Sequence, residues 1–169
     1  DWSSDVCSSD LGIEARFGHL DILVNNAGVL LDDTARRPSE QSLACWRETF
    51  ETNVFAVVQV TQALLPLLRA ARAARIVNVS SQLASFGWHT DPASPIYNFK
   101  IPAYDASKSV VNSWTVHLAY ELKDTPIKVN AIHPGYVQTD MNAGAGELSV
   151  QEGAKSSVQM ALLDDDGAT

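Results

Sequence analysis

Apolar residues form three short runs along the chain, and each run closes at a turn signal. The runs lie within Leu20–Gly28, Arg75–Ser81 and Ile127–Ile132. Short apolar runs bounded by glycine, proline, asparagine or serine are typical of buried strands. Continuous rather than alternating hydrophobicity is typical of strands that are covered on both faces, as in a parallel sheet. The pattern therefore predicts three buried strands.

Two longer segments have helical spacing instead, one from about Gln41 to Ala71 and one from Tyr104 to Lys123. Apolar positions three or four residues apart place one face of a helix against a core. Pro66 is expected to kink or shorten the end of the first helix. The two apolar stripes are Phe50, Val54, Val57, Val58, Thr61, Leu64, Leu65 and Leu68 in the first helix, and Val111, Trp114, Leu118 and Leu122 in the second.

The alternation of strands and helices predicts parallel βαβ units and hence a doubly wound α/β fold, whose ligands bind beyond the carboxyl ends of the strands. Three polar or glycine-containing segments follow those ends: Asn25–Gly28, Ser81 and Pro134–Thr139. Further along, the glycine-rich segment 139–148 is expected to be mobile. A capping box of Ser149 and Glu152 predicts a last helix that extends to about Leu163.

Composition narrows the function classes. The 169 residues carry 20 acidic and 12 basic side chains, a net charge of −8, which argues against nucleic acid as a partner. Neither the two cysteines, Cys7 and Cys45, nor the histidines have metal-ligand spacing, and a cytoplasmic location fits this cysteine usage. The longest apolar stretch, Val54–Leu68, is interrupted by Gln59 and Pro66, so we expect no membrane span and no membrane partner.

Tyr104 and Lys108 are separated by one helical turn, so the phenol and the ammonium share a face of the predicted helix. A nearby cation favours the phenolate, and we expect Lys108 to lower the pKa of Tyr104 toward the working range. A tyrosine with such a pKa can act as a general acid or base. Taken alone, this spacing is common on solvated helices and is weak evidence for a site.

Five motifs in one order resemble the short-chain dehydrogenase/reductase family. They are NNAG at Asn25–Gly28, ETNVFA around Asn53, IVNVSS ending at Ser81, YDASK at 104–108, and HPGYVQT, which contains Pro134–Thr139. Five motifs in order are far more specific than any one of them. The resemblance extends from about Ile13 to the C-terminus and implies a Rossmann-like, doubly wound parallel sheet, of which the chain holds the C-terminal two-thirds.

The resemblance implies a role for each of four catalytic residues. Tyr104 would be the general acid/base that protonates the substrate oxygen in reduction, and Lys108 would lower its pKa and bind the nicotinamide ribose. Ser81 would hold the substrate oxygen by a hydrogen bond, and Asn53 would anchor a water that links Lys108 to solvent. The alternatives are a simple strand end for Ser80 or Ser81, and a helix kink for Asn53, which is a poor helix former.

The same resemblance implies NAD or NADP as the cofactor, and the choice between the two stays open. Besides Tyr104 and Lys108, two loops would contact it. The first would pass the adenine ribose, and its alternative is a tight turn; the second would face the nicotinamide, and its alternative is a strand stop. The loop residues are Asn25, Asn26, Ala27 and Gly28 in the first, and Pro134, Gly135, Val137 and Thr139 in the second.

The chain departs from the family pattern at Ala84, where family members usually have a glycine, and in the greater length of the segment between Ser81 and Tyr104. Asp21 and Asp105 are predicted to be solvated or capping residues, and no histidine is assigned chemistry. Four aromatic residues of the long segment could line a substrate pocket or pack on the surface, and the two alternatives weigh equally: Phe86, Trp88, Tyr97 and Phe99.

Residues 1–11, DWSSDVCSSDL, are predicted to be an artefactual tail because they resemble translated sequencing-adapter sequence; a natural disordered tail is the alternative. Residues 12–169 are predicted to be a partial Rossmann-like oxidoreductase domain. No glycine-rich βαβ turn, which would hold a pyrophosphate, precedes Asp21, and the last strand of such folds is also missing.

The predicted function is an NAD(P)-dependent oxidoreductase that interconverts a small-molecule alcohol and a carbonyl. The alternative is a catalytically incompetent fragment or a non-catalytic binding module of the same fold. The family resemblance implies a homodimer or homotetramer of the complete protein through the two long helices. The 169-residue chain alone is expected to aggregate and to bind neither NADH nor NADPH appreciably.

Overall fold

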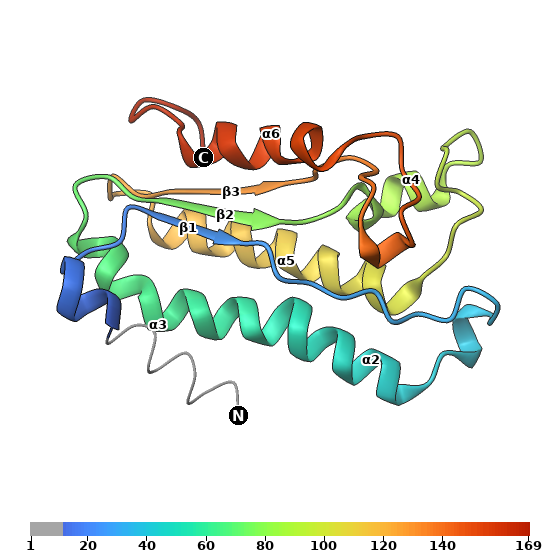
Figure 1. The fold of residues 1–169 in the computed structure, drawn as a ribbon. Helices are drawn as coiled ribbons and strands as arrows, with labels where there is room; N and C mark the ends of the chain where they lie inside the picture. The colour runs from blue at the N-terminus through green and yellow to red at the C-terminus, as the bar shows by residue number, and fades with distance from the viewer. Residues whose placement is uncertain (1–11) are drawn as a thin grey trace.

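The computed structural model describes residues 12–169, and the predicted artefactual tail lies outside the described residues. Three strands, β1 (Ile22–Asn25), β2 (Arg75–Val79) and β3 (Lys128–Ile132), form one parallel sheet in the order β1-β2-β3. The carboxyl ends of all three strands lie at one edge of the sheet (Figure 1). The three strands predicted from the apolar runs are therefore confirmed, each slightly shorter than its run.

Helices cover both faces of this sheet. Helices α3 (Ala56–Ala70) and α5 (Pro102–Glu121) pack on one face, and α6 (Val150–Ala161) packs on the other (Figure 1). This arrangement of three layers confirms the predicted doubly wound fold. The predicted capping box opens α6, because the Glu152 amide donates to Ser149 Oγ at 3.3 Å and the Ser149 amide donates to Glu152 Oε2 at 2.9 Å.

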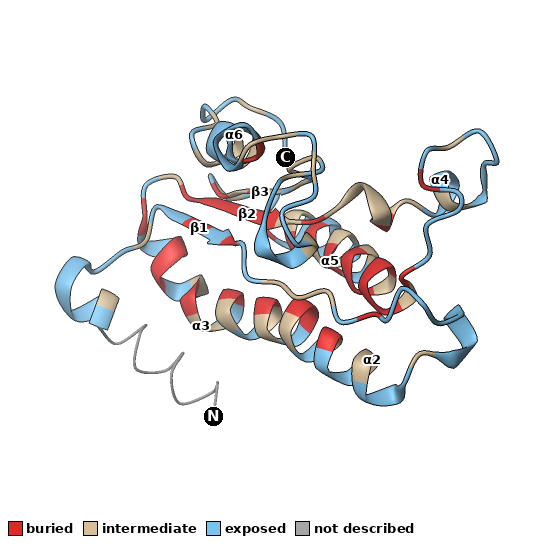
Figure 2. Ribbon diagram, turned by 45° about the vertical axis from the view of Figure 1, so that its right-hand side comes forward, coloured by how far each residue is buried: buried red, intermediate tan, exposed pale blue. Residues whose placement is uncertain are grey.

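The first predicted long helix consists of three consecutive segments: α2 (Leu43–Phe50), the π-helical turn η2 (Glu51–Phe55) and α3. Pro66 lies inside α3 without ending it before Ala70. The whole helix is long and apolar enough to cross a membrane by length and composition, a test that core helices of soluble proteins also pass. Its buried positions lie along the side that faces the sheet (Figure 2).

The apolar core lies between the sheet and helices α3 and α5. It forms because the stripes of both helices meet the side chains that β1, β2 and β3 point toward that face. Among the described residues, this cluster consists of Leu23, Leu64, Leu67, Leu68, Ala71, Ala74, Ile76, Leu118, Leu122, Ile127 and Val129.

A buried polar network crosses the same layer near the carboxyl edge of the sheet. Asn25 Nδ2, at the end of β1, donates to Thr61 Oγ1 at 3.0 Å and to Asn78 Oδ1 at 2.8 Å. Asn78 Nδ2 in turn donates to Thr115 Oγ1 at 2.8 Å. Buried amides are stabilising only when they are hydrogen-bonded, and here they join two strands to α3 and α5. The network fixes the strand ends relative to both helices.

Three connections leave the carboxyl edge of the sheet. The first runs from β1 to α2 and contains the 3-10 turn η1 (Pro38–Glu40), and the second contains the 3-10 turn η3 (Gln82–Ala84) and helix α4 (Phe86–Thr90). The third contains the 3-10 turn η4 (Asp140–Asn142) and a bridge between Val137 and Leu148. All the predicted functional segments lie on these connections or beside them.

Candidate active site

Tyr104 lies in the first turn of α5, one turn before Lys108, as predicted. Pro102 occupies a first-turn position, and the N-cap residue Ile101 has no side chain that can accept a hydrogen bond. The carboxylate of Asp32, from the connection after β1, caps the helix instead by accepting from the amides of Ala103 at 2.9 Å and Tyr104 at 3.0 Å. Sequence reasoning missed Asp32. The available signal was a helix start without a local capping side chain.

Ser81 follows β2, and its side chain lies near enough to the phenol of Tyr104 to affect the pKa of that phenol. Burial raises the pKa of Tyr104 above its usual value; the hydrogen bond with Ser81 opposes this rise, and the charge of Asp105 adds to it. The neighbouring Ser80 is buried and donates to the Lys108 carbonyl oxygen at 3.3 Å. Of the two serines, Ser81 is therefore the one whose side chain lies near the phenol.

Lys108 reaches back from α5 to the end of β2. Its Nζ donates to the Val79 carbonyl oxygen at 2.8 Å and lies 5.6 Å from the centroid of the Tyr104 ring. The residue is only 4% exposed, and burial lowers the pKa of its ammonium to about 8. The expectation that Lys108 lowers the pKa of Tyr104 is wrong for this structure, because burial of the phenol raises that pKa and Lys108 is not among the groups that shift it.

Asn53 lies in the π-helical turn η2 and is fully buried. Its Oδ1 accepts from the Val29 amide at 2.8 Å, while its Nδ2 lies 2.9 Å from the Val29 carbonyl oxygen and 3.0 Å from Ser107 Oγ. The side chain thus ties the connection after β1 to α5. A π turn inside an α-helix is frequent at functional sites. The turn at Asn53 is therefore compatible with both predicted alternatives, a helix kink and a catalytic role.

Gly28 lies beside the side chains of both Lys108 and Asn53. A Cβ atom at this position would lie 3.3 Å from Lys108 Nζ and 3.4 Å from Asn53 Oδ1. The absence of a side chain leaves room beside the ammonium. In the same loop, Asn26 and Ala27 are exposed, whereas the Asn25 side chain is committed to the buried polar network and strengthens the sheet.

The loop Pro134–Thr139 follows β3 at the same edge. Gly135 has a φ of 86°, which favours glycine. The Val137 carbonyl oxygen accepts from Asn142 Nδ2 at 2.8 Å, but its amide donates to no other residue within 12–169. The Thr139 side chain is exposed. An unused amide and an accessible hydroxyl are thus available to a ligand on this side of the site.

Of the two predicted roles of Asp105, solvated or capping, the structure supports the capping role. The residue is only 8% exposed rather than solvated, and it has the expected capping contact, since Oδ2 accepts from the Ile101 amide at 3.3 Å. The same oxygen lies 3.3 Å from Nε2 of His89, a residue to which the sequence assigned no chemistry. Burial raises the pKa of the Asp105 carboxyl to about 6, while the charge of His89 opposes this rise.

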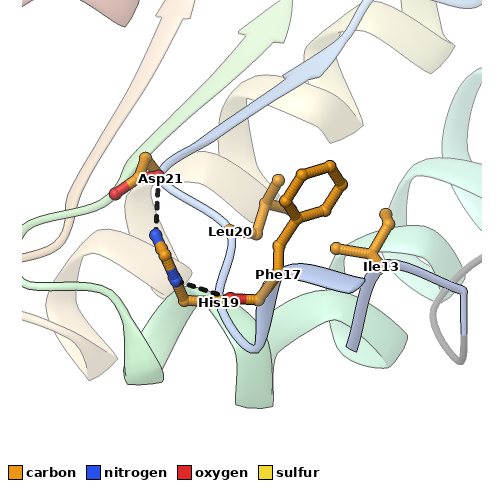
Figure 3. Close-up of a pocket in the computed structure, with 5 residues that line it drawn as sticks. All are labelled: Ile13, Phe17, His19, Leu20 and Asp21. Carbon is orange, nitrogen blue, oxygen red and sulfur yellow. Dashed lines mark hydrogen bonds and ion pairs between the residues drawn. The ribbon is translucent and has the colours of Figure 1, made fainter. Parts of the chain in front are cut away.

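Two hollows elsewhere on the molecule contain none of the predicted site residues. One, of about 370 Å³, lies at the amino end of β1 and is lined by Ile13, Phe17, His19, Leu20 and Asp21 (Figure 3). The other, of about 620 Å³, lies between α5 and β3. The first lies at the opposite end of the strand from Tyr104, and its polar pair, His19 and Asp21, is exposed. Neither hollow combines buried reactive groups as the carboxyl edge does.

Comparison with known proteins fits this geometry. The family described as short chain dehydrogenase matches residues 11–148. The short-chain dehydrogenase anuI of Penicillium roqueforti is 38% identical over 166 residues, which are 95% of this chain and 64% of that protein. The chain thus spans just under two thirds of the length of this curated relative.

Solved structures that resemble this chain also include short-chain dehydrogenases. Salutaridine reductase from Papaver somniferum superposes with a TM-score of 0.84 at 27% identity, over 100% of this chain and 78% of that chain. A short chain dehydrogenase from Shigella flexneri complexed with NADP has a TM-score of 0.69 at 32% identity and covers 83% of this chain and 54% of that one. The chain therefore belongs to the short-chain dehydrogenase family.

Proposed function

We propose that the complete protein is an NAD(P)-dependent oxidoreductase that interconverts a small-molecule alcohol and a carbonyl, with Tyr104 as the general acid/base. The observation that carries the proposal is the proximity of Tyr104, at the start of α5, to Ser81, at the end of β2, next to the buried Lys108 ammonium. Two neighbouring hydroxyls can hold one substrate oxygen from two sides. This pairing suits a reaction in which that oxygen gains or loses a proton.

In the direction of reduction, Ser81 holds the carbonyl oxygen and Tyr104 donates its proton to it. Because burial raises the pKa of Tyr104, the phenol keeps its proton at neutral pH and is ready to act as the acid. The nearby Lys108 ammonium stabilises the phenolate that remains after transfer. In oxidation the same groups act in reverse, and the phenolate accepts the proton of the alcohol.

The residues present fit a nicotinamide dinucleotide, which supplies the hydride in reduction and accepts it in oxidation. Within residues 12–169, Lys108 Nζ donates only to the Val79 carbonyl oxygen, so ammonium hydrogens remain for the ribose hydroxyls. Gly28 has no side chain that would crowd this ammonium. The Val137 amide and the Thr139 hydroxyl are suited to the carboxamide. Whether the cofactor is NAD or NADP stays open.

Replacement of the phenol tests the proposal. In the complete protein, Tyr104→Phe is expected to lower kcat about a hundredfold to ten-thousandfold, because a positioned general acid contributes a factor of this size. The matched control is Tyr120→Phe, on the same helix at a position that is 72% exposed, and it is expected to have wild-type turnover. Substantial turnover by Tyr104→Phe, with a normal circular dichroism spectrum, would contradict the proposal.

We also propose that the complete protein is a homodimer or homotetramer that pairs through α3, α5 and their neighbouring turns. Support comes from apolar side chains that stay exposed there, among them Phe55 at 50% and Val116 at 66%. Sedimentation velocity at micromolar concentration should detect a dimer or tetramer, and Val116→Glu should shift it toward monomer. A monomeric wild-type protein would count against this assembly.

A further inference from the structure

The imidazole of His89 lies at the junction of the two segments that carry Ser81 and Tyr104. Its Nε2 is 2.9 Å from the Leu83 carbonyl oxygen and 3.3 Å from Asp105 Oδ2. Leu83 belongs to the turn that starts at Ser81, and its amide donates to Ser81 Oγ at 3.1 Å. Asp105 directly follows Tyr104 in α5. One ring nitrogen therefore contacts both halves of the candidate site.

The partners of the ring show which of its nitrogens donates toward Leu83. A carbonyl oxygen only accepts, so Nε2 must carry the hydrogen that points toward Leu83 and Asp105. Lys100 Nζ lies 3.3 Å from Nδ1, the other nitrogen of the ring. The hydrogen on Nε2 serves the Leu83 carbonyl oxygen, and Asp105 Oδ2 lies beside the same nitrogen. Lys100 also donates to the His89 carbonyl oxygen at 3.0 Å and so fixes the residue that carries the ring.

The Asp105 carboxylate, which contacts the His89 ring, is buried at a cost to the stability of the fold. Asp105 is 8% exposed, and its Oδ1 is fully buried without a hydrogen-bond partner in the described part of the chain. The charged groups that face it are His89 and Lys100 from the segment before α5, and Asp32 from the connection after β1. An incompletely paired buried carboxylate is destabilising, and such costs are concentrated at functional sites.

A second contact spans the same two segments. Ser109, one turn after Asp105, donates to the Ala84 carbonyl oxygen at 3.0 Å and to the Asp105 carbonyl oxygen at 2.9 Å. The turn 81–84 is thus fastened to α5 at two points. His89 contacts Leu83 and Asp105, which lie two residues and one residue from Ser81 and Tyr104. Ala84 and Ser109, the partners in the other contact, lie further from them in the sequence.

We propose that His89 and Asp105 are positioning residues: their contact joins the turn of Ser81 to the first turn of α5 and fixes the separation of the Ser81 and Tyr104 hydroxyls. This inference rests on the proposed roles of Ser81 and Tyr104. Its physical basis is that a misplacement of about 1 Å in a catalytic pair costs about a hundredfold in rate. His89 and Asp105 act through this geometry and need not touch the substrate.

The test compares three variants of His89 and its surroundings in the complete protein. His89→Leu removes the bridge and is expected to lower kcat about tenfold to a hundredfold while the KM for cofactor stays within about twofold. His89→Gln restores a donor toward Leu83 and should recover most of that loss. His117→Leu, an exposed histidine on the helix of Tyr104, is the control and should match wild type.

A readout independent of turnover is the NMR titration of ¹³C-labelled tyrosine. Loss of the bridge should weaken the hydrogen bond between Ser81 and Tyr104, so the apparent pKa of Tyr104 should rise in His89→Leu and return toward the wild-type value in His89→Gln. If His89→Leu does not fold, Asp105→Leu breaks the same bridge with an apolar residue that suits a buried position, and the same fall in kcat is expected. The Tyr104 titration is read only in the His89 variants, because loss of the Asp105 charge by itself lowers the pKa of Tyr104.

Two results would overturn the inference. One is a bridge-breaking variant with wild-type kcat and an unchanged Tyr104 titration. The other is equal impairment of His89→Leu and His89→Gln, because a hydrogen-bonding role requires rescue by the amide. A failure of the proposed function is distinguishable from both, since it would be seen as turnover by Tyr104→Phe.

Discussion

Removal of the Asp32 carboxylate should destabilise the protein more than its place in a surface connection indicates. The side chain is 7% exposed, and its two oxygens accept separately from the amides of Ala103 and Tyr104 at 2.9 and 3.0 Å. The N-cap residue Ile101 offers no substitute acceptor. Asp32→Ala therefore leaves two amides at the start of α5 without their partner.

The expected magnitude follows from these two bonds. A hydrogen bond to a charged group contributes about 1.5–3 kcal/mol, and truncation of a capping side chain typically costs about 0.5–2 kcal/mol because water reaches the freed amides. The carboxylate also interacts favourably with the helix dipole, worth about 0.3–1 kcal/mol. For a buried carboxylate that serves two donors, we expect a loss of about 2–3 kcal/mol for Asp32→Ala. Asp32→Asn keeps one accepting oxygen and should lose about 1 kcal/mol.

Urea and thermal unfolding followed by circular dichroism measure these differences. In a chain of this size, 2–3 kcal/mol corresponds to a fall in Tm of about 5–10 °C. Asp33→Ala is the matched control, because the neighbouring Asp33 is exposed and its carboxylate contacts only Ala35 and Arg36 within residues 12–169. A loss for Asp32→Ala no greater than that of Asp33→Ala would refute the assignment of Asp32 as the cap of α5.

Two further predictions concern Lys108 and Gly153. Burial lowers the folded-state pKa of Lys108 to about 8, below the unfolded value of 10.5, so stability should rise as the pH rises from 8 to 10.5. Lys108→Met should remove this rise with pH and increase the free energy of unfolding by about 1–3 kcal/mol at pH 7. Urea unfolding at pH 7 and pH 10 measures both effects, and a free energy of unfolding that still rises with pH as in the wild type would contradict the prediction. A Cβ at Gly153 would overlap Val137 Cγ2 and lie 3.1 Å from Cγ1, so Gly153→Ala should cost about 1–3 kcal/mol by separating α6 from the loop after β3. Gly12→Ala, with open space around it, is the control, and equal unfolding midpoints for the two variants would exclude this packing.

The elements that sequence predicts well are those encoded within a single segment. The apolar runs gave three strands, and the stripe Val54–Leu68 gave the core face of α3, because periodicity is a local property. The positions of Asn25–Gly28, Ser81 and Pro134–Thr139 at one edge of the sheet followed from topology, since parallel strands carry their carboxyl ends to the same side. Even the start of α5 was displaced by only two residues, from Tyr104 to Pro102.

What sequence did not predict depends on contacts between distant segments. Asp32 and the Tyr104 amide are separated by 72 positions, and Asn25 and Asn78 by 53. Neither pair has a pattern that local spacing can detect. The pKa of Tyr104 was predicted in the wrong direction for the same reason: the distance to Lys108 is encoded in one helical turn, whereas the burial that decides the shift is created by the whole fold.

The two buried charges beside Tyr104 carry opposite pH dependences. The folded pKa of Asp105 is raised to about 6 from 3.8, so the free energy of unfolding falls as the pH rises through that interval. The folded pKa of Lys108 is lowered to about 8, so the destabilisation by its buried charge is relieved only as the pH rises above 8. Between pH 6 and 8 both groups are charged, buried and destabilising. A fold selected for stability alone would replace both with apolar residues. Their presence next to Tyr104 in the same helix is explained if the ammonium stabilises a phenolate and the carboxylate holds the His89 bridge. Both of these roles require the charged form in the pH range where it is most costly.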